Sequence, residues 1–454
     1  MIHARGFRTR RFWNWFPMGL TYALLYMGRY NLTVSKNALG TLMTKVDFGW
    51  IFGIGAAVYA VSFLINGPLV DRIGGKRGIL IAAFGAGGAN LAMGFYLWRV
   101  MGMEDPSGAP LRLVFSLLYA LNMYFQSYGA VSIVKVNAHW FHVKERGTFS
   151  GIFGIMISSG IFLAFDVSQR ILESPLVSGQ GHAGGDATWW VFFSPAVLLF
   201  LLFAVETFLL RDQPSRAGFA DFDTGDESSG EDLNIRIPTR RLLRRILTHP
   251  VILTVAGIEF CTGVLRNGVM HWFPILANEK VAAGLVGKGW DFMLHNWGLL
   301  LMIAGIIGGN LAGILSDKVF QSRRAPAAGF LYASMTLFIV AMAFSLSGGW
   351  MLGALVFCVS VCVIGTHGLL SGTATMDFGG RRGAATAVGI IDGFVYLGTA
   401  VQSFSLGWIT SRNWTAWPWF LLPFAVIGLV LLIRIWKAMP GGIKKVEKKV
   451  TGIR

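Results

Sequence analysis

The sequence is poor in charged residues and in cysteine. Only 14% of its 454 residues are Asp, Glu, Lys or Arg, whereas a soluble protein has about 25%, so an ordinary soluble enzyme is excluded. The three cysteines, Cys261, Cys358 and Cys362, all lie in apolar stretches, and they provide neither a disulfide framework nor a set of metal ligands. We therefore expect a membrane protein that has no enzymatic activity, no metal and no other cofactor.

Long apolar runs make up most of the chain. Hydrophobic residues are 54% of the sequence, and glycine is unusually frequent at 58 residues. A run of about 20 apolar residues spans a bilayer as a helix, and small residues let such helices pack closely. The chain is therefore predicted to be an all-α membrane protein with twelve transmembrane helices. The twelve runs lie near residues 12–33, 49–70, 79–99, 112–138, 148–167, 188–210, 250–276, 292–316, 327–347, 350–372, 384–411 and 415–436.

The distribution of basic residues predicts the orientation of the chain. If the N-terminus is cytoplasmic, the segments on that side hold 27 Lys and Arg residues and the opposite loops hold 8. Cytoplasmic loops of membrane proteins are the basic ones, so both termini are predicted to be cytoplasmic, in a plasma membrane, with a bacterial inner membrane favoured. The first run lacks the cleavage site of a signal peptide and is interpreted as a retained span. Because the charge is spread over many loops, nucleic-acid binding is excluded.

A polar segment at residues 211–248 divides the twelve runs into two sets of six. It contains an acidic patch around Asp221 and Asp226 and ends with arginine pairs. Such a segment is either a flexible linker that lies partly on the membrane surface or a regulatory docking segment. The predicted organisation is a six-helix half over residues 1–210, this cytoplasmic linker, a second six-helix half over residues 249–438 and a basic cytoplasmic tail over residues 439–454.

The two sets of six spans resemble each other, which indicates an internal duplication. A Gly-x-x-x-Asp-basic motif follows the second and eighth spans, and an Arg-Gly pair follows the fourth and tenth. Halves related in this way hold a substrate site between them near the membrane midplane. The residues concerned are Gly67, Asp71 and Arg72 in the first motif, Gly313, Asp317 and Lys318 in the second, and Arg146 and Arg382 in the pairs.

These loops have a physical role beyond topology. Glycine lets two helix ends pack closely, and Asp71 can accept hydrogen bonds from a neighbouring helix N-terminus or from basic loop residues in one conformation only. We therefore expect gating loops between two moving halves; the alternative is that the basic residues merely set the topology. The loop at residues 67–77 resembles the signature of the major facilitator superfamily. The resemblance implies that superfamily's fold of two pseudo-symmetric six-helix halves.

Two arginines lie inside predicted spans, where charge is energetically costly. Arg29 in the first span and Arg266 in the seventh occupy matching positions of the repeat, so we expect them to face each other across a central cavity. A charge at the centre of a bilayer costs at least about 2.5–3.5 kcal/mol, and the planar guanidinium suits bidentate binding of phosphate. The pair predicts an anion site; the alternative is that each arginine pairs with an internal acid.

Two acidic residues inside spans are candidates for that alternative. Glu259 precedes Arg266 by seven residues, which is roughly 10 Å along a helix, so we expect no direct pair, although both can line the cavity. Asp392 lies in the eleventh span. Three roles remain open for it: a resting counter-ion of an arginine, a proton-coupled carboxylate, or a hydrogen-bonded packing residue. The intramembrane histidines show no ligand spacing, so no metal site is predicted.

The arginine segments bring a narrower resemblance. They are similar to those of the organophosphate:phosphate antiporter family, which includes glycerol-3-phosphate and hexose-phosphate transporters. The family's Asn-x-x-Phe-Gln-x-x-Gly pattern is present at residues 122–129, and its Tyr-Leu-Gly at residues 396–398. The resemblance implies a monomer that exchanges an organophosphate for inorganic phosphate by alternating access, with both arginines on the phosphate. It further implies a set of substrate-binding residues, which are Arg29, Arg266, Tyr22, Tyr26, Gln126 and Tyr396.

The sequence departs from the family at three cavity positions. Tyr30 follows the first arginine where bacterial members often have lysine, and Phe63 and Ile157 stand where a lysine and a histidine occur in glycerol-3-phosphate transporters. The organic part of the substrate is therefore left open. Two other functions are compatible with the sequence. One is a proton-coupled carrier of an organic anion such as a carboxylate, with Asp392 or Glu259 as the proton site; the other is a sugar-phosphate sensor that does not transport.

Overall fold

The chain folds into a bundle of helices. The computed structural model describes residues 5–174, 187–224, 250–285, 289–321 and 323–437, with side chains described except at residues 143–144, 146–153, 372–385 and 387. All regular structure within these residues is helical, without a strand, so the all-α prediction is confirmed. Most of the predicted linker 211–248 and the predicted tail 439–454 lie outside the described residues.

Helical rods in the described parts of the chain follow all twelve predicted spans. The rods of the first six spans are α1 (Phe7–Leu39), α2 (Lys45–Ile73), α3 (Gly75–Met101), α4 (Leu111–Trp140), α5 (Val143–Phe162) with the π segment η3 (Leu163–Val167) and α6 (Ser168–Glu173), and α8 (Trp190–Leu209). The rods of the last six are α10 (Pro250–Met270) with α11 (Trp272–Ala282), α13 (Trp297–Ile314) with η5 (Leu315–Val319), α14 (Arg324–Ala343), α15 (Gly349–His367) with η6 (Gly368–Ala374), α16 (Thr375–Arg412) and α17 (Ala416–Arg434). The short α12 (Trp290–His295) precedes α13.

Three of these rods are more polar than the others. Nine described helical stretches are long and apolar enough to cross a membrane by composition alone. The remaining rods are α1, α4 and α16, which carry Arg29, Gln126 and Asp392. Polar residues in membrane helices face the interior of the bundle or a water-filled cavity, so these three helices indicate where a functional site should lie.

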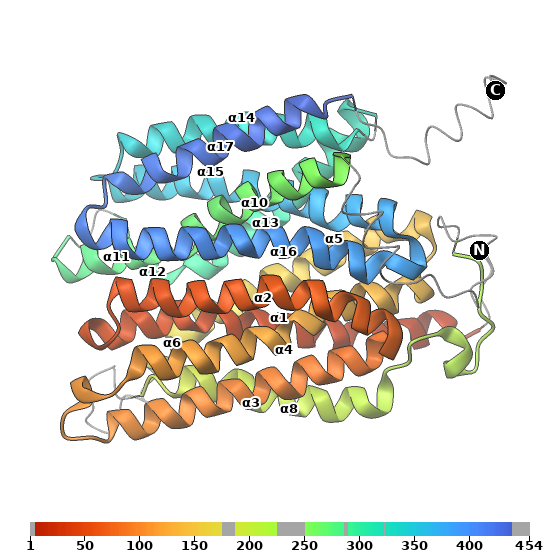
Figure 1. The fold of residues 1–454 in the computed structure, drawn as a ribbon, viewed down its shortest axis with the longest axis horizontal. Coiled ribbons are helices and arrows are strands. Elements are labelled where there is room, and N and C mark those ends of the chain that lie inside the picture. The colour runs from red at the N-terminus through yellow and green to blue at the C-terminus, as the bar shows by residue number, and fades with distance from the viewer. Residues whose placement is uncertain (1–4, 175–186, 225–249, 286–288, 322, 438–454) are drawn as a thin grey trace.

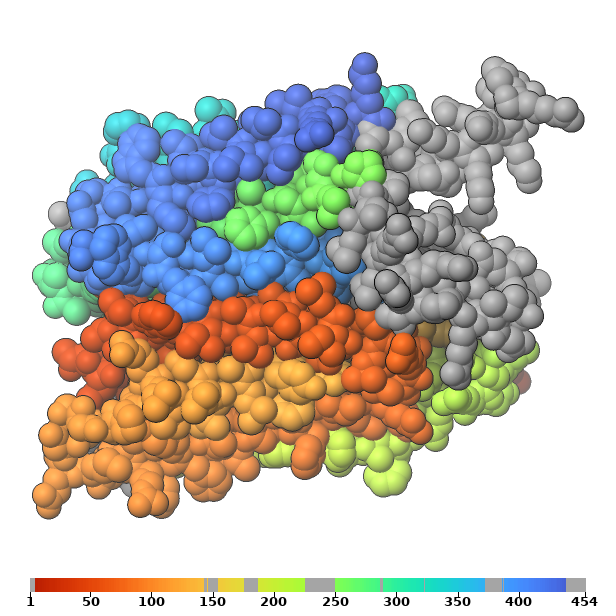
Figure 2. Space-filling view, in the orientation of Figure 1, coloured from red at the N-terminus to blue at the C-terminus, as the bar shows by residue number. Residues whose placement is uncertain are grey.

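The rods form two groups that correspond to the two halves of the sequence. Figure 1 shows α1 to α4 and α8 on one side of the bundle and most of α10 to α17 on the other, with α2 beside α16 at the boundary. Figure 2 shows α2 and α16 in contact along the visible face, and α5 also packs against α13. The start of α1 and the end of α17 lie at the same end of the bundle (Figure 1), which we call the terminal end.

Glycines permit the close approach of α16 to its neighbours. A Cβ atom on Gly49 of α2 would lie 2.6 Å from the carbonyl oxygen of Ser403 and 2.9 Å from the Cα of Gly407, both on α16. A Cβ atom on Gly398 of α16 would lie 2.0 Å from the carbonyl oxygen of Phe260 on α10. Because any larger residue would push these helices apart, small residues set the spacing between the two halves and within the second half.

Polar contacts join the two halves at the end opposite to the terminal end. Asp166 of η3 accepts hydrogen bonds from the backbone N–H groups of Gly298 (2.6 Å) and Leu299 (2.8 Å), in the first turn of α13. A carboxylate is favourable there because the first N–H groups of a helix lack partners within the helix. Lys45 of α2 also forms an ion pair with Glu279 of α11, at 2.8 Å. Both contacts connect residues of different halves, so they hold this end closed.

Candidate anion-binding site

Arg29 lies within α1, and its side chain is fully buried. Its guanidinium donates hydrogen bonds to Oε1 of Gln126 on α4 (2.8 Å), to the hydroxyl of Tyr396 on α16 (2.5 Å) and to the hydroxyl of Tyr59 on α2 (2.7 Å). All three acceptors are neutral, and the described part of the chain provides no ion pair to Arg29. The hydrogen-bonding groups are therefore satisfied while the positive charge is not neutralised.

Tyrosine rings surround the Arg29 guanidinium. Its Cζ atom lies 4.6 Å from the ring centroid of Tyr59, 4.7 Å from that of Tyr26, 5.6 Å from that of Tyr396 and 5.8 Å from that of Tyr30. Each such cation–π contact stabilises a cation by about 0.5–2 kcal/mol. The surroundings therefore stabilise the charge through ring quadrupoles and hydroxyl dipoles rather than through an opposite charge.

Helix α4 fixes the position of Arg29. Asn122 donates from Nδ2 to the carbonyl oxygen of Gly28 (2.9 Å), and Tyr119 donates to the carbonyl oxygen of Arg29 itself (2.9 Å). Gln126 donates from Nε2 to Oδ1 of Asn122 (3.0 Å) while it accepts from Arg29. Residues four apart on a helix face the same side, which is the physical reason for the Asn-x-x-x-Gln spacing. The motif holds both the backbone and the side chain of Arg29.

Arg266 lies on α10 and is 5% exposed. Its Nε and Nη2 atoms, which occupy the same edge of the guanidinium, have no hydrogen-bond partner among the described residues. Tyr26, Tyr30 and Tyr396 lie within electrostatic range of both Arg266 and Arg29, so the two guanidiniums share a neighbourhood. Burying an uncompensated charge costs several kcal/mol per ion. The arrangement can therefore bind an anion, with a free two-donor edge on Arg266.

The predicted tyrosines and glutamine gather around Arg29. Tyr26, Gln126 and Tyr396 contact its side chain directly. Tyr22 lies one turn farther along α1 and packs edge to face against Tyr26, with ring centroids 5.2 Å apart. That these four residues bind substrate stays a prediction, but the structure brings them together at one buried arginine.

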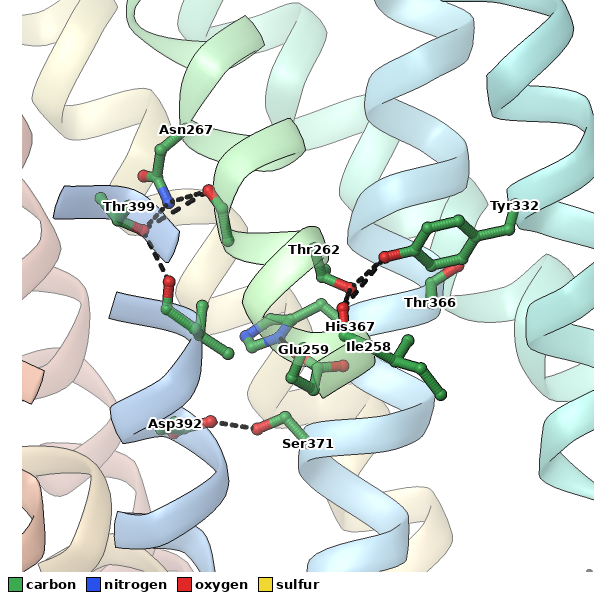
Figure 3. Close-up of polar contacts among 12 residues, drawn as sticks. Ile258, Glu259, Thr262, Asn267, Tyr332, Thr366, His367, Ser371, Asp392 and Thr399 are labelled. Carbon is green, nitrogen blue, oxygen red and sulfur yellow. Dashed lines mark hydrogen bonds and ion pairs between the residues drawn. The ribbon is translucent and has the colours of Figure 1, made fainter. Parts of the chain in front are cut away.

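The two intramembrane acids have partners other than arginine. Glu259 of α10 is fully buried, and its Oε2 atom lies 2.8 Å from Nδ1 of His367 on α15. Asp392 of α16 accepts a hydrogen bond of 2.5 Å from Ser371 on η6 (Figure 3). Among the side chains that the structure describes, neither acid forms an ion pair with an arginine. Glu259 and Arg266 are thus not directly paired, as expected, and Asp392 is hydrogen-bonded rather than a counter-ion in this conformation.

Asp71 connects the two halves at the terminal end. It forms an ion pair with Lys135 of α4 at 2.8 Å and accepts a hydrogen bond from Oγ1 of Thr386 on α16 at 3.0 Å. Its basic partner therefore belongs to a transmembrane helix, not to a loop as expected. The Thr386 bond joins α2 of the first half to α16 of the second, which is the kind of contact that a gating residue needs.

The equivalent Asp317 has a different surrounding. It pairs with Arg324 at 2.8 Å, and Arg324 also donates to Ser316 at 2.7 Å, so these contacts stay within the second half. The duplicated motif is therefore structurally asymmetric. Of the other gating candidates, Arg72 and Lys318 are exposed, the space beside Gly313 is open, Gly67 lies close to Gly389 of α16, and the side chains of Arg146 and Arg382 lie outside the described ones.

Comparison with known proteins identifies the family. The model of the Major Facilitator Superfamily matches residues 18–403, which include both arginines and most of both halves. The chain belongs to this superfamily. A solved structure with the same fold is that of a bacterial homologue of the human lysosomal transporter Spinster, in an inward-facing and unoccupied conformation. Its TM-score is 0.64 at 14% identity, over 95% of each chain.

Relatives within the superfamily agree with the narrower resemblance. The glycerol-3-phosphate transporter of Bacillus subtilis is 24% identical over 91% of this chain and 90% of its own. A probable hexose phosphate transport protein of Chlamydia pneumoniae is 24% identical, with 93% and 90% covered. The membrane sensor protein UhpC of Salmonella typhimurium is also 24% identical, with 93% and 89% covered. The predicted resemblance is confirmed, and the chain is a superfamily transporter rather than an enzyme.

Three residues of this superfamily member escaped the sequence analysis. Lys135 lies inside the fourth predicted span, and a charge in an apolar run is a signal that could have revealed it. His367 was interpreted as an isolated histidine, yet it contacts Glu259. Tyr59 has no distinguishing pattern around it, and only the packing of α2 against α1 and α16 brings it to Arg29.

Proposed function

We propose that this chain exchanges an organophosphate for inorganic phosphate across the membrane by alternating access. The observation that carries the proposal is the pair of buried guanidiniums: Arg29 has only neutral partners, and Arg266 has two unpartnered nitrogen atoms in the described part of the chain. A phosphate group supplies both the negative charge and the acceptors that they lack. Two similar proteins are named as glycerol-3-phosphate and hexose phosphate transporters, which supports a phosphate ester as the substrate.

The two arginines contribute differently to this site. The Nε and Nη2 atoms of Arg266 form one edge of a planar group, which fits two oxygen atoms of a phosphate. Arg29 already donates to two tyrosine hydroxyls, and a phosphate dianion replaces such neutral acceptors because charge-assisted hydrogen bonds are about twice as strong. Tyr59 and Tyr396 then become free to bond the phosphate or the organic group.

Neutralisation of the site explains exchange rather than one-way transport. Two positive charges disfavour closure around an empty site, because each loses its hydration as the halves come together. A bound phosphate removes that penalty, and its differential affinity for the closed state favours the transition. The carrier therefore changes conformation mainly when it is loaded, in either direction, and one phosphate compound moves for another.

The same proposal includes the orientation and assembly of the carrier. The described ends of α1 and α17 lie at the terminal end, as an even number of spans requires, and the basic loops place that end in the cytoplasm. We propose a monomer in a bacterial inner membrane, because the site lies within one chain and draws its arginines from both halves.

Phosphate exchange in proteoliposomes tests this function. Vesicles that contain the purified protein are loaded with inorganic phosphate, and labelled phosphate is added outside. We expect uptake that needs internal phosphate and that falls to background in Arg29→Ala and in Arg266→Ala. The matched control is Arg412→Ala, an exposed arginine that stacks on Trp408 at 3.7 Å, for which we expect uptake near that of the wild type.

The other outcomes separate the rival functions. Phosphate binding without exchange would indicate a sensor. Uptake of an organic anion that follows the pH gradient and ignores internal phosphate would indicate a proton-coupled carrier. Normal exchange in either alanine variant would contradict the arginine site itself.

A further inference from the structure

Helix α10 carries unpartnered polar atoms of opposite kind at two positions. At Arg266, two N–H donors have no partner in the described structure, and at Glu259 the Oε1 acceptor has none. Both residues are almost completely buried, at 5% and 0% exposure. A buried donor or acceptor without a partner is destabilising, so each position calls for a complementary group. A ligand that satisfies both must accept at one end and donate at the other.

The surroundings of Glu259 are polar and not sealed. Its Oε2 atom contacts Nδ1 of His367, whose side chain remains 19% exposed. Asp392, which accepts from Ser371, lies within electrostatic range of Glu259, His367 and Arg266. Figure 3 shows the Glu259–His367 pair beside the Asp392–Ser371 pair, between α10, α15 and α16. The acceptor at Glu259 therefore belongs to a polar cluster that extends from the second arginine.

The helix that carries both groups is held on two sides. Tyr332 of α14 lies 2.8 Å from the hydroxyl of Thr262 and donates to the carbonyl oxygen of Ile258 at 3.1 Å. On the other side, Asn267 donates to Thr399 of α16 at 2.8 Å (Figure 3). These bonds fix the rotation and height of α10 on either side of Glu259. The distance between the donor edge and the acceptor is therefore a fixed property of the site.

That distance selects a chain length. Seven residues of helix separate the two positions by roughly 10 Å. A six-carbon chain spans roughly 7 Å and a three-carbon chain roughly 3 Å, at the advance of about 1.3 Å per bond that an extended backbone shows. With a hydrogen bond at each end, a phosphate on Arg266 and a hydroxyl on Glu259 fit the ends of a hexose phosphate. Glycerol 3-phosphate is too short to reach both.

We infer that Glu259, held by His367, binds a hydroxyl group at the end of the substrate remote from the phosphate, so that the carrier selects hexose phosphates. The inference rests on the proposed function, since it takes the phosphate to lie on the arginines. The same cluster rejects a second negative charge, because a carboxylate at the remote end meets Glu259 and Asp392, and like charges in a buried site repel strongly. Phosphorylated carboxylic acids are therefore poor substrates.

Competition against phosphate exchange tests the inference. Glucose 6-phosphate, glycerol 3-phosphate and 3-phosphoglycerate each compete with labelled phosphate in proteoliposomes. Every half-inhibitory concentration is divided by that of unlabelled phosphate, so a general loss of activity cancels. We expect Glu259→Leu, which removes the acceptor, to raise the ratio for glucose 6-phosphate about tenfold and to leave the ratio for glycerol 3-phosphate within a factor of two.

A second variant separates the acceptor from its charge. Glu259→Gln has the same shape and keeps an acceptor oxygen, so the glucose 6-phosphate ratio should change less than threefold, while 3-phosphoglycerate should improve about tenfold. The matched control is Glu206→Gln, a buried acid of α8 that accepts from Thr21 at 2.9 Å and also has an unpartnered oxygen. It lies in the other half, and all three ratios should equal those of the wild type.

The outcomes are distinct from those of the proposed function. No phosphate exchange by the wild type overturns the proposed function and this inference with it. Exchange that depends on both arginines, with an unchanged glucose 6-phosphate ratio in Glu259→Leu, overturns the inference alone. Equal shifts in Glu259→Gln and Glu206→Gln would assign both acids a merely structural role and would likewise overturn it.

Discussion

Arg29 and Arg266 occupy matching positions in the two halves, yet their surroundings differ. Arg29 donates three hydrogen bonds and lies among four tyrosine rings, whereas Arg266 leaves two nitrogen atoms unpartnered among the described residues. The first half therefore holds its arginine in place before any substrate arrives, and the second half holds an arginine with free donors. Duplication supplied two similar helices, and divergence around them made one arginine a fixed support and the other an available binding group.

Replacing each arginine by lysine should give the largest effects and should break the comparison most directly. Lysine keeps the charge and loses the two-donor edge, so we expect phosphate exchange to fall at least about a hundredfold in Arg29→Lys and in Arg266→Lys, or roughly 2.7 kcal/mol. Stability should differ, because only Arg29→Lys leaves Gln126, Tyr59 and Tyr396 without their donor, at about 1–3 kcal/mol. Exchange assays and thermal unfolding of the purified variants measure both; equal loss of stability in the two would contradict the asymmetry.

Gln126→Leu should sharpen the account of the fixed arginine. It removes the acceptor of Arg29 Nε and the donor to Asn122, so we expect about a tenfold loss of phosphate affinity and a lower unfolding temperature. The control is Gln169→Leu, because Gln169 is part of an exposed hydrogen bond to Glu173. An affinity that stays at the wild-type value in Gln126→Leu would show that α4 does not position Arg29.

The duplicated aspartates extend the comparison to the terminal end. Asp71 bonds across the halves, while Asp317 forms an exposed pair within one half. We expect Asp71→Asn to slow maximal exchange about tenfold with little change in the half-saturating phosphate concentration, since it alters the conformational step and not the site. Asp317→Asn should change the rate less than threefold, because exposed ion pairs contribute about 0–1 kcal/mol. Initial rates over a range of phosphate concentrations distinguish the two, and equal slowing would mean that both loops act in the same way.

The smallest effect is expected at the opposite end. Glu279 pairs with Lys45 and accepts from Trp414 at 2.7 Å, and its side chain is 39% exposed. Glu279→Gln keeps the Trp414 bond and loses the ion pair, so we expect a change in exchange rate of no more than about twofold, declining further at high salt. A loss of tenfold or more would show that this pair, rather than Asp166, dominates the closure of that end.

Local sequence information predicted the fold well, and the site only in part. Each span announces itself by its own apolar run, and Arg29 and Arg266 by being charged within such runs. The partners of these residues are another matter. Tyr59, Lys135 and His367 reach Arg29, Asp71 and Glu259 from helices distant in sequence. Such pairings depend on the rotation of each helix and on glycine contacts such as that of Gly49 with α16, which hydrophobic periodicity does not specify.

Asp166 has a consequence for the kinetics of the transport cycle. Its carboxylate satisfies two backbone N–H groups of α13 across the halves, and it is 1% exposed. Opening that end separates the carboxylate from both donors, and water must then hydrate all three groups within a narrow space. The opening step therefore takes up water, so its rate should fall when water activity is lowered by an excluded osmolyte. Osmotic stress then becomes a reporter of which end of the carrier opens in the slowest step.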